Sequence, residues 1–129
     1  MIEFTLAIDP QPKLRPRFSR GRVYTPSKTV AFESSVALLA NRFRPSTALL
    51  GPLEVSIDFF IKPPQKPKAA LPIVKPDIDN FAKSVCDALN GIFWHDDSQI
   101  CDLRVRKFYD WTTKTGSIRV SISEMKGKE

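Results

Sequence analysis

The sequence predicts an α/β fold of the mixed α+β kind, with helices packed on a mixed sheet. Two observations lead to this prediction. Several segments alternate apolar and polar residues, as half-buried strands do, and two segments between them place apolar residues at helical spacing. The length of 129 residues suits one hydrophobic core, so we expect a single domain over residues 1–129. The expected order of elements is β-α-β-α-β-β.

The first third of the chain predicts a strand, a loop and a helix. Alternation over residues 2–8 indicates the strand, which Pro10 ends, and residues 10–26 form a loop rich in Pro and Arg. Ser27 is a suitable N-cap for a helix over residues 28–43. The apolar stripe of this helix consists of Val30, Val36, Ala37, Ala40 and Phe43.

The middle of the chain predicts a second strand and a second helix. Regular alternation over residues 53–61 indicates the strand, and the proline-rich residues 62–76 form an extended loop. Asp77 or Asp79 caps a helix that ends just before Gly91. The helical spacing is that of Phe81, Val85, Ala88 and Leu89.

The last third predicts two strands joined by a turn. Residues 99–109 form the first of these strands, and residues 113–116 suit the turn because they end in a glycine. Alternation of Ile118, Val120 and Ile122 indicates the final strand.

The composition indicates an anionic partner, with nucleic acid ahead of an acidic protein or a membrane surface, because the net charge is +6 and the pI about 9.6. No run reaches the roughly 18 apolar residues of a membrane span, and the N-terminus does not resemble a signal peptide. Two cysteines and the single His95 do not support a disulfide framework or a zinc site, so a cytoplasmic setting fits. We expect Cys86 and Cys101 to be buried, and Trp94 and Trp111 to lie in the core or a dimer contact.

The positive charge is interrupted by an acidic segment over residues 77–97, which carries one Lys against five Asp. After Pro76 the chain is expected to be extended, so Asp77 and Asp79 point the same way and can share a hard divalent cation such as Mg²⁺. Asp96 or Asp97 can supply a further carboxylate from a second element.

Lys83 follows Asp79 by four residues and shares its helix face, where it can bind a scissile phosphate. Each of these acidic residues also has a purely structural interpretation, as a helix cap, a surface ion pair or a turn residue. The joint pattern of several Asp residues around one helix favours a carboxylate metal site.

A basic arm is expected in the loop over residues 10–26, where aromatic Phe18 and Tyr24 interleave with positive charges. Its basic residues are Lys13, Arg15, Arg17, Arg20 and Arg22. We interpret it as a DNA-contacting arm, with a solubilising loop as the alternative. A second basic strip consists of Lys62, Lys66, Lys68 and Lys75.

Four short motifs occur in order at fixed spacings in the centre of the chain. They are Pro76-Asp77-Ile78-Asp79-Asn80, Lys83, Asp87-Ala88-Leu89 and Trp94-x-Asp96-Asp97-x-Gln99. Two motifs precede them, Pro12-x-x-Arg15-Pro16-Arg17 and Tyr24-x-Pro26-x-x-Thr29. Together they resemble the RusA family of Holliday junction resolvases, which are small endodeoxyribonucleases of bacteria and their prophages.

The resemblance implies a homodimer with an α/β fold that binds four-way DNA junctions and makes paired symmetric nicks with Mg²⁺ or Mn²⁺. It implies that Asp77, Asp79 and Asp97 are catalytic metal ligands and that Lys83 is the catalytic lysine. Asp96 is retained as an outer ligand, because the spacing before the Asp pair is about one residue shorter than in the family.

The sequence therefore predicts an Mg²⁺-dependent, structure-selective endodeoxyribonuclease of DNA recombination and repair. It is expected in the bacterial cytoplasm with the nucleoid, without a membrane or a small-molecule cofactor. The expected DNA-binding residues are Lys13, Arg15, Arg17, Arg20, Arg22 and Lys75. The alternatives are a non-catalytic module that binds branched DNA and a nuclease that acts on forks or flaps.

Overall fold

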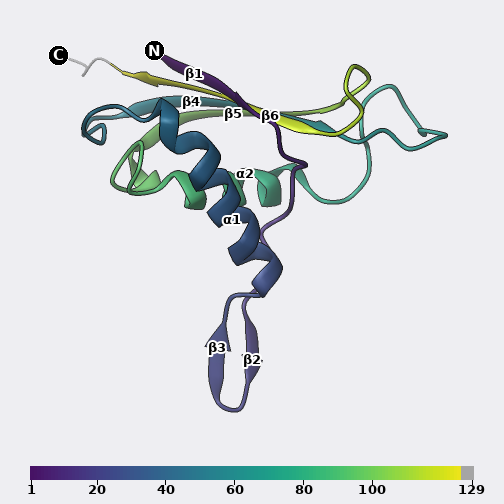
Figure 1. The fold of residues 1–129 in the computed structure, drawn as a ribbon, viewed down its shortest axis with the longest axis horizontal. Helices are drawn as coiled ribbons and strands as arrows, with labels where there is room; N and C mark the ends of the chain where they lie inside the picture. The colour runs from purple at the N-terminus through teal and green to yellow at the C-terminus, as the bar shows by residue number, and fades with distance from the viewer. Residues whose placement is uncertain (126–129) are drawn as a thin grey trace.

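The computed structural model describes residues 1–125 and shows the predicted mixed α+β architecture (Figure 1). Its main sheet has the strand order β1-β6-β4-β5, in which β4 pairs parallel with β5 and the other pairs are antiparallel. The strands are β1 (Ile2–Leu6), β4 (Leu53–Ile61), β5 (Ile100–Tyr109) and β6 (Ser117–Glu124). The helices α1 (Ser27–Ala40) and α2 (Ile78–Leu89) cover one face of this sheet.

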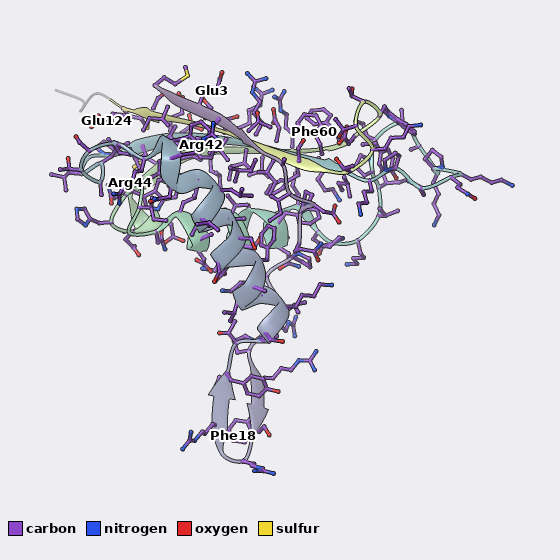
Figure 2. All side chains as sticks on the ribbon, in the orientation of Figure 1. Glu3, Phe18, Arg42, Arg44, Phe60 and Glu124 are labelled. Atoms are coloured by element: carbon purple, nitrogen blue, oxygen red, sulfur yellow. The ribbon has the colours of Figure 1, made fainter. Side chains whose placement is uncertain are left out.

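The central strand β4 forms the middle of the core, because it lies between β5 and β6. Its alternate residues Leu53, Val55, Ile57 and Phe59 are fully buried beneath the helices. Side chains on the other face of the sheet, including Glu3 and Phe60, point away from the helices (Figure 2). The alternation predicted for this strand is confirmed.

Helix α2 buries the predicted face, which includes Phe81, Val85 and Leu89. Phe59 of β4 stacks on Phe81 with ring centroids 5.0 Å apart, which fixes the helix against the sheet. Gly91 follows the helix with a φ of +81°, a conformation that favours glycine and ends the helix where the sequence predicts. The packed face leaves the opposite side of α2 free for polar residues.

Helix α1 differs from its prediction at both ends and in its buried face. Pro26 stands at the N-cap position and no side chain caps the helix, so Ser27 is the first helical residue. The helix ends at Ala40, and a 3₁₀ turn (Asn41–Phe43) replaces the expected last turn. The buried residues are Thr29, Phe32, Val36 and Ala40, whereas Val30 is 48% exposed. The polar Thr29 belongs to the buried face because its hydroxyl accepts a hydrogen bond from the backbone of Leu14.

The expected loop over residues 10–26 contains a small hairpin, formed by β2 (Arg17–Ser19) and β3 (Arg22–Tyr24). Its turn residues Arg20 and Gly21 have φ values of 51° and 75°, as a two-residue turn with positive φ requires. The hairpin stands away from the sheet and the helices (Figure 1). Its strands have three residues each, too few for an alternation pattern to reveal them.

Within residues 1–125, neither helix has the length and apolar character that crossing a bilayer requires.

The predicted turn between β5 and β6 is organised by Asp110. Its carboxylate accepts hydrogen bonds from the backbone and hydroxyl of Thr113 and, at 3.0 Å, from the backbone of Gly116. These hydrogen bonds, led by the one from the Thr113 side chain, lower the pKa of Asp110 to about 2.

Replacing Asp110 by Asn is expected to lower the melting temperature near neutral pH. The folded pKa of Asp110 lies below the ordinary value of about 3.9, so its stabilisation is present above that pH and is lost as the pH falls towards 2. Thermal melts of the wild type and Asp110→Asn should therefore converge over this range. A constant difference at every pH would contradict the assignment. The exposed Asp102 supplies a matched control, Asp102→Asn.

Candidate active site

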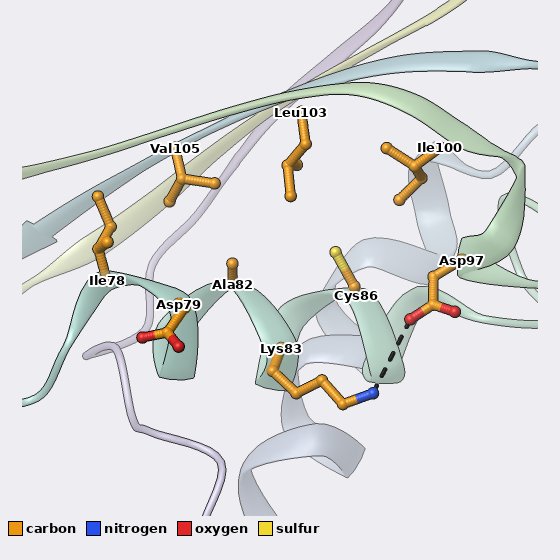
Figure 3. Close-up of a pocket in the computed structure, with 9 residues that line it drawn as sticks. All are labelled: Ile78, Asp79, Ala82, Lys83, Cys86, Asp97, Ile100, Leu103 and Val105. Carbon is orange, nitrogen blue, oxygen red and sulfur yellow. Dashed lines mark ion pairs between the residues drawn. The ribbon is translucent and has the colours of Figure 1, made fainter.

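A pocket of about 400 Å³ lies between α2 and β5, where the side of the helix that carries Ile78, Ala82 and Cys86 faces the edge strand (Figure 3). Its apolar wall consists of Ile78, Ala82 and Cys86 from the helix and Ile100, Leu103 and Val105 from the strand. Its polar residues are Asp79, Lys83 and Asp97. Three of the four catalytic residues predicted from the sequence therefore line one pocket.

Local structure explains how these side chains meet. Asp79 and Lys83 lie one helical turn apart on α2 and share a face, as their spacing predicts. Asp97 begins a 3₁₀ turn, η2 (Asp97–Gln99), that leads directly into β5. The buried Trp94 fixes the connection from α2, because its indole donates a 2.5 Å hydrogen bond to the side chain of Asn90.

Lys83 carries the positive charge of the pocket. Its ammonium lies 3.3 Å from Asp87 and 4.0 Å from Asp97. Figure 3 shows Asp79 and Asp97 at opposite ends of the pocket, with Lys83 extended towards Asp97. The Lys83 ammonium can therefore face an anion bound at the pocket while its ion pair with Asp87 keeps the lysine side chain in place.

Asp96 and Asp97 have different environments although they are neighbours. The side chain of Asp96 accepts a hydrogen bond from the backbone of Ser98, and the side chain of Gln99 accepts one from the backbone of Asp96. This capping box, led by the Ser98 hydrogen bond, lowers the pKa of Asp96. Asp96 thus caps η2, whereas Asp97 lines the pocket.

Asp77 lies at the N-cap position of α2, outside the pocket lining, and pairs with Lys75 at 3.0 Å. The segment before it is held by Lys107, whose ammonium donates to the backbone oxygens of Val74 and Pro76. These contacts orient the start of the helix.

Over residues 1–125, no three His, Cys, Asp or Glu side chains converge closely enough to hold one metal ion. The donor types still fit a hard divalent cation, because Mg²⁺ is commonly held by one or two carboxylates together with substrate phosphate. Asp79 and Asp97 provide two carboxylates at one pocket.

The sequence that forms this fold and pocket matches a known protein family. The family model of endodeoxyribonuclease RusA matches residues 7–123. The chain belongs to the RusA family. The crossover junction endodeoxyribonuclease RusA of Escherichia coli K12 is 30% identical, with 84% of this chain and 82% of that protein covered.

The chain is also similar to a phage protein and to a protein of Bacillus subtilis. The crossover junction endodeoxyribonuclease of Enterobacteria phage 82 is 30% identical, over 84% of this chain and 82% of its own length. A Bacillus subtilis protein described as uncharacterized protein YqaN is 39% identical, over 84% of this chain and 87% of its own. The range matched by the family model, residues 7–123, includes both the arm and the pocket of this RusA family member.

The basic residues predicted to bind DNA fall into two groups. Arg15, Arg17, Arg20 and Arg22 are exposed, and within residues 1–125 none of them forms an ion pair with an acidic side chain. Lys13 and Lys75 form the second group, because each is paired with an acidic side chain of the protein.

Lys13 fastens the arm to both helices. Its ammonium lies 2.7 Å from Glu33 of α1 and 3.1 Å from Asp87 of α2. Burial lowers the pKa of Lys13, but its hydrogen bonds to Glu33 and Asp87 outweigh burial and raise it. No local sequence pattern indicates this role, or that of Lys107, since both residues contact segments far away in the chain.

The two cysteines and two tryptophans do not behave alike. Cys86 and Trp94 are buried as expected, whereas Cys101 is exposed and Trp111 is 52% exposed. Cys101 lies near the start of the edge strand β5, where its side chain is exposed. Burial raises the pKa of the Cys86 thiol to about 12, and the nearby carboxylates of Asp97 and Asp87 add to the shift.

Only Cys101 is expected to react with a disulfide reagent such as DTNB in the native protein at pH 8. The thiol of Cys86 is buried and protonated at that pH, and the thiolate is the reactive form. One equivalent of reagent should be consumed rapidly, and the second only after unfolding. Cys101→Ser should remove the rapid phase. Rapid modification of both thiols would contradict the position of Cys86.

Proposed function

We propose that this protein is an endodeoxyribonuclease that resolves four-way DNA junctions by paired symmetric nicks, in recombination and repair. The observation that carries the proposal is that Asp79, Lys83 and Asp97 line one pocket in a member of the RusA family. Two of the relatives bear the name crossover junction endodeoxyribonuclease, which supports the same substrate here.

The reaction is proposed to depend on Mg²⁺ or Mn²⁺, with Asp77, Asp79 and Asp97 as ligands and Asp96 as an outer neighbour. Carboxylate oxygens are the ligands that such cations prefer. When bound, the cation would neutralise charge on the scissile phosphate and lower the pKa of the attacking water. The excess of carboxylates at this site would repel DNA in the absence of a cation.

Lys83 is proposed to stabilise the negative charge that develops on the phosphate. Its side chain is 58% exposed, so a phosphate oxygen can approach the ammonium from the open side. Asp87 is held by Lys13 as well as by Lys83. Asp87 is thereby kept in place to orient Lys83 towards the pocket.

The arm is proposed to hold the DNA backbone through Arg15, Arg17, Arg20 and Arg22. Arginine binds phosphate with two parallel hydrogen bonds, and these contacts do not depend on base sequence. Binding should therefore weaken steeply as the salt concentration rises. The protein is proposed to act in the bacterial cytoplasm at the nucleoid, without a small-molecule cofactor.

A homodimer is proposed because two symmetric cuts require two sites. A four-way junction is nearly two-fold symmetric, and a C₂ dimer presents two pockets related by the same symmetry. The edge strand β5 is a candidate contact, since within residues 1–125 it pairs with β4 alone. Its side chain Leu103 is 46% exposed beside the pocket.

Replacing Leu103 by Arg is expected to convert the dimer to a monomer. An edge strand that carries an inward-pointing charge resists pairing with another edge. Light scattering after size-exclusion chromatography should give 14.6 kDa for the variant and about twice that mass for the wild type. A variant that remains a dimer would place the interface elsewhere.

The proposed function is tested with an end-labelled four-way junction, a replication fork and a linear duplex of the same sequence. Each is incubated with protein in Mg²⁺ and in EDTA. We expect paired nicks in the junction that require Mg²⁺, and little cutting of the other substrates. Binding without metal-dependent nicking would refute the enzyme, and preferred cutting of the fork would refute the junction as substrate. Calorimetric titration with Mg²⁺ alone provides a separate test of metal binding.

A further inference from the structure

The β2–β3 hairpin has two chemically different faces. Residues directly opposite each other on paired strands point to the same face, and successive residues alternate. Phe18 is opposite Val23, so these two apolar side chains share one face. Arg17 is opposite Tyr24 and Ser19 is opposite Arg22, so these pairs share the other.

The apolar face of the hairpin is open to solvent. Phe18 is 72% exposed and Val23 is 70% exposed, and Figure 2 shows Phe18 on the part of the hairpin that stands away from the body. Both strands are exposed throughout. An isolated two-stranded hairpin is marginally stable in water, so this segment gains stability when a ligand covers it.

The stem of the hairpin is fixed to the same helix that carries Asp79 and Lys83. The backbone of Lys13 donates a 3.2 Å hydrogen bond to the backbone oxygen of Asn80 in α2. The Lys13 ammonium pairs with Asp87, one turn after Lys83. The direction of the hairpin is thus set relative to the pocket, although its tip lies far from the body.

The positive charge around Phe18 and Val23 indicates which kind of ligand binds the hairpin. Residues 10–26 contain five basic residues and no acidic one. A suitable ligand has negative charges for the arginine side chains and flat apolar surfaces for the apolar face. DNA with unstacked bases has both, in its phosphates and its base faces. Intact duplex hides its base faces inside the stack, whereas bases at a branch point are exposed.

We propose that the β2–β3 hairpin is a base-reading wedge that selects branched DNA over duplex. Phe18 stacks on a base exposed at the branch point, and Val23 packs beside it. Arg17, Arg20 and Arg22 hold the flanking phosphates. This proposal rests on the proposed function for its choice of branched DNA, and it assigns to the hairpin a role in selectivity that phosphate contacts cannot supply.

The test compares binding of a four-way junction, single-stranded dT20 and linear duplex, measured by fluorescence anisotropy in EDTA so that no strand is cut. Phe18→Val keeps an apolar residue that favours strands but removes the ring, and Phe18→Trp enlarges the ring. We expect Phe18→Val to lose about tenfold in preference for junction and single strand over duplex. Phe18→Trp should keep the preference, and duplex affinity should not change.

A matched control separates the two faces. Arg17→Ala and Arg22→Ala are expected to weaken binding to all three DNAs by a similar factor and to reduce the salt dependence. An unchanged preference in Phe18→Val would overturn the wedge. The wedge would also be overturned if Phe18→Val lost binding to anionic phosphatidylserine vesicles while its binding to DNA did not change. That result would identify a membrane surface as the ligand.

The outcome for the wedge can be separated from that for the proposed function. If the wild type does not distinguish junction from duplex, junction resolution fails. The wedge is then judged on single-stranded DNA alone, where Phe18→Val must still lower the preference over duplex. If the wild type nicks junctions but Phe18→Val selects them equally well, the proposed function stands and the wedge fails.

Discussion

Replacing Asp79 by Asn is expected to abolish nicking of the junction while leaving junction binding intact. Asn keeps the shape of the side chain but removes the charge with which the carboxylate would hold a divalent cation. A bound metal contributes several kcal/mol of charge stabilisation to phosphoryl chemistry, so the rate should fall by roughly a thousandfold. Affinity in EDTA should stay level or rise, because one negative charge facing the DNA has been removed.

The measurement uses saturating protein, so that a change in binding cannot be mistaken for a change in rate. Asp102→Asn is a matched control, since it removes the same charge from the face of the sheet away from the pocket. That variant should nick at the wild-type rate. Cleavage by Asp79→Asn within tenfold of the wild type would exclude a ligand role for Asp79.

The sequence predicted the parts of the fold that follow a regular period. Strand β4 and helix α2 each bury one continuous face against the core, and such faces leave a clear pattern of apolar residues. Part of the pocket is predicted from the same helical period, because the i, i+4 spacing places Asp79 and Lys83 on one side of α2. Its position beside β5 depends on strand order, which a local pattern does not contain.

The failures of prediction also have physical causes. The buried face of α1 includes Thr29, whose hydroxyl accepts a hydrogen bond from Leu14, so a purely apolar stripe selected Val30 instead. The hairpin of β2 and β3 makes no core, so no apolar pattern marks it. The ion pairs of Lys13 depend on contacts between distant segments.

The structure also gives different environments to Asp96 and Asp97, of which the resemblance favoured Asp97 as the metal ligand. Asp96 and Asp97 are adjacent and chemically identical, and spacing alone did not choose between them. The choice depends on η2, in which Asp96 is occupied in capping while Asp97 lines the pocket. The tertiary turn, rather than the motif, gives the two side chains different environments.

This separation leads to an expected contrast between Asp97→Asn and Asp96→Asn. Asp97→Asn should lose nicking by roughly a thousandfold, for the same reason as Asp79→Asn. Asp96→Asn should nick at nearly the wild-type rate and melt at nearly the same temperature, because Asn caps a helix about as well as Asp.

The two variants form a matched pair, since each removes one charge and the positions are adjacent. A general effect of charge on DNA binding would change both variants equally and would appear in the affinities measured in EDTA. A ligand role changes only the residue whose carboxylate reaches the metal, and it should also weaken Mg²⁺ binding in calorimetry. Loss of nicking in Asp96→Asn with retention in Asp97→Asn would reverse the assignment.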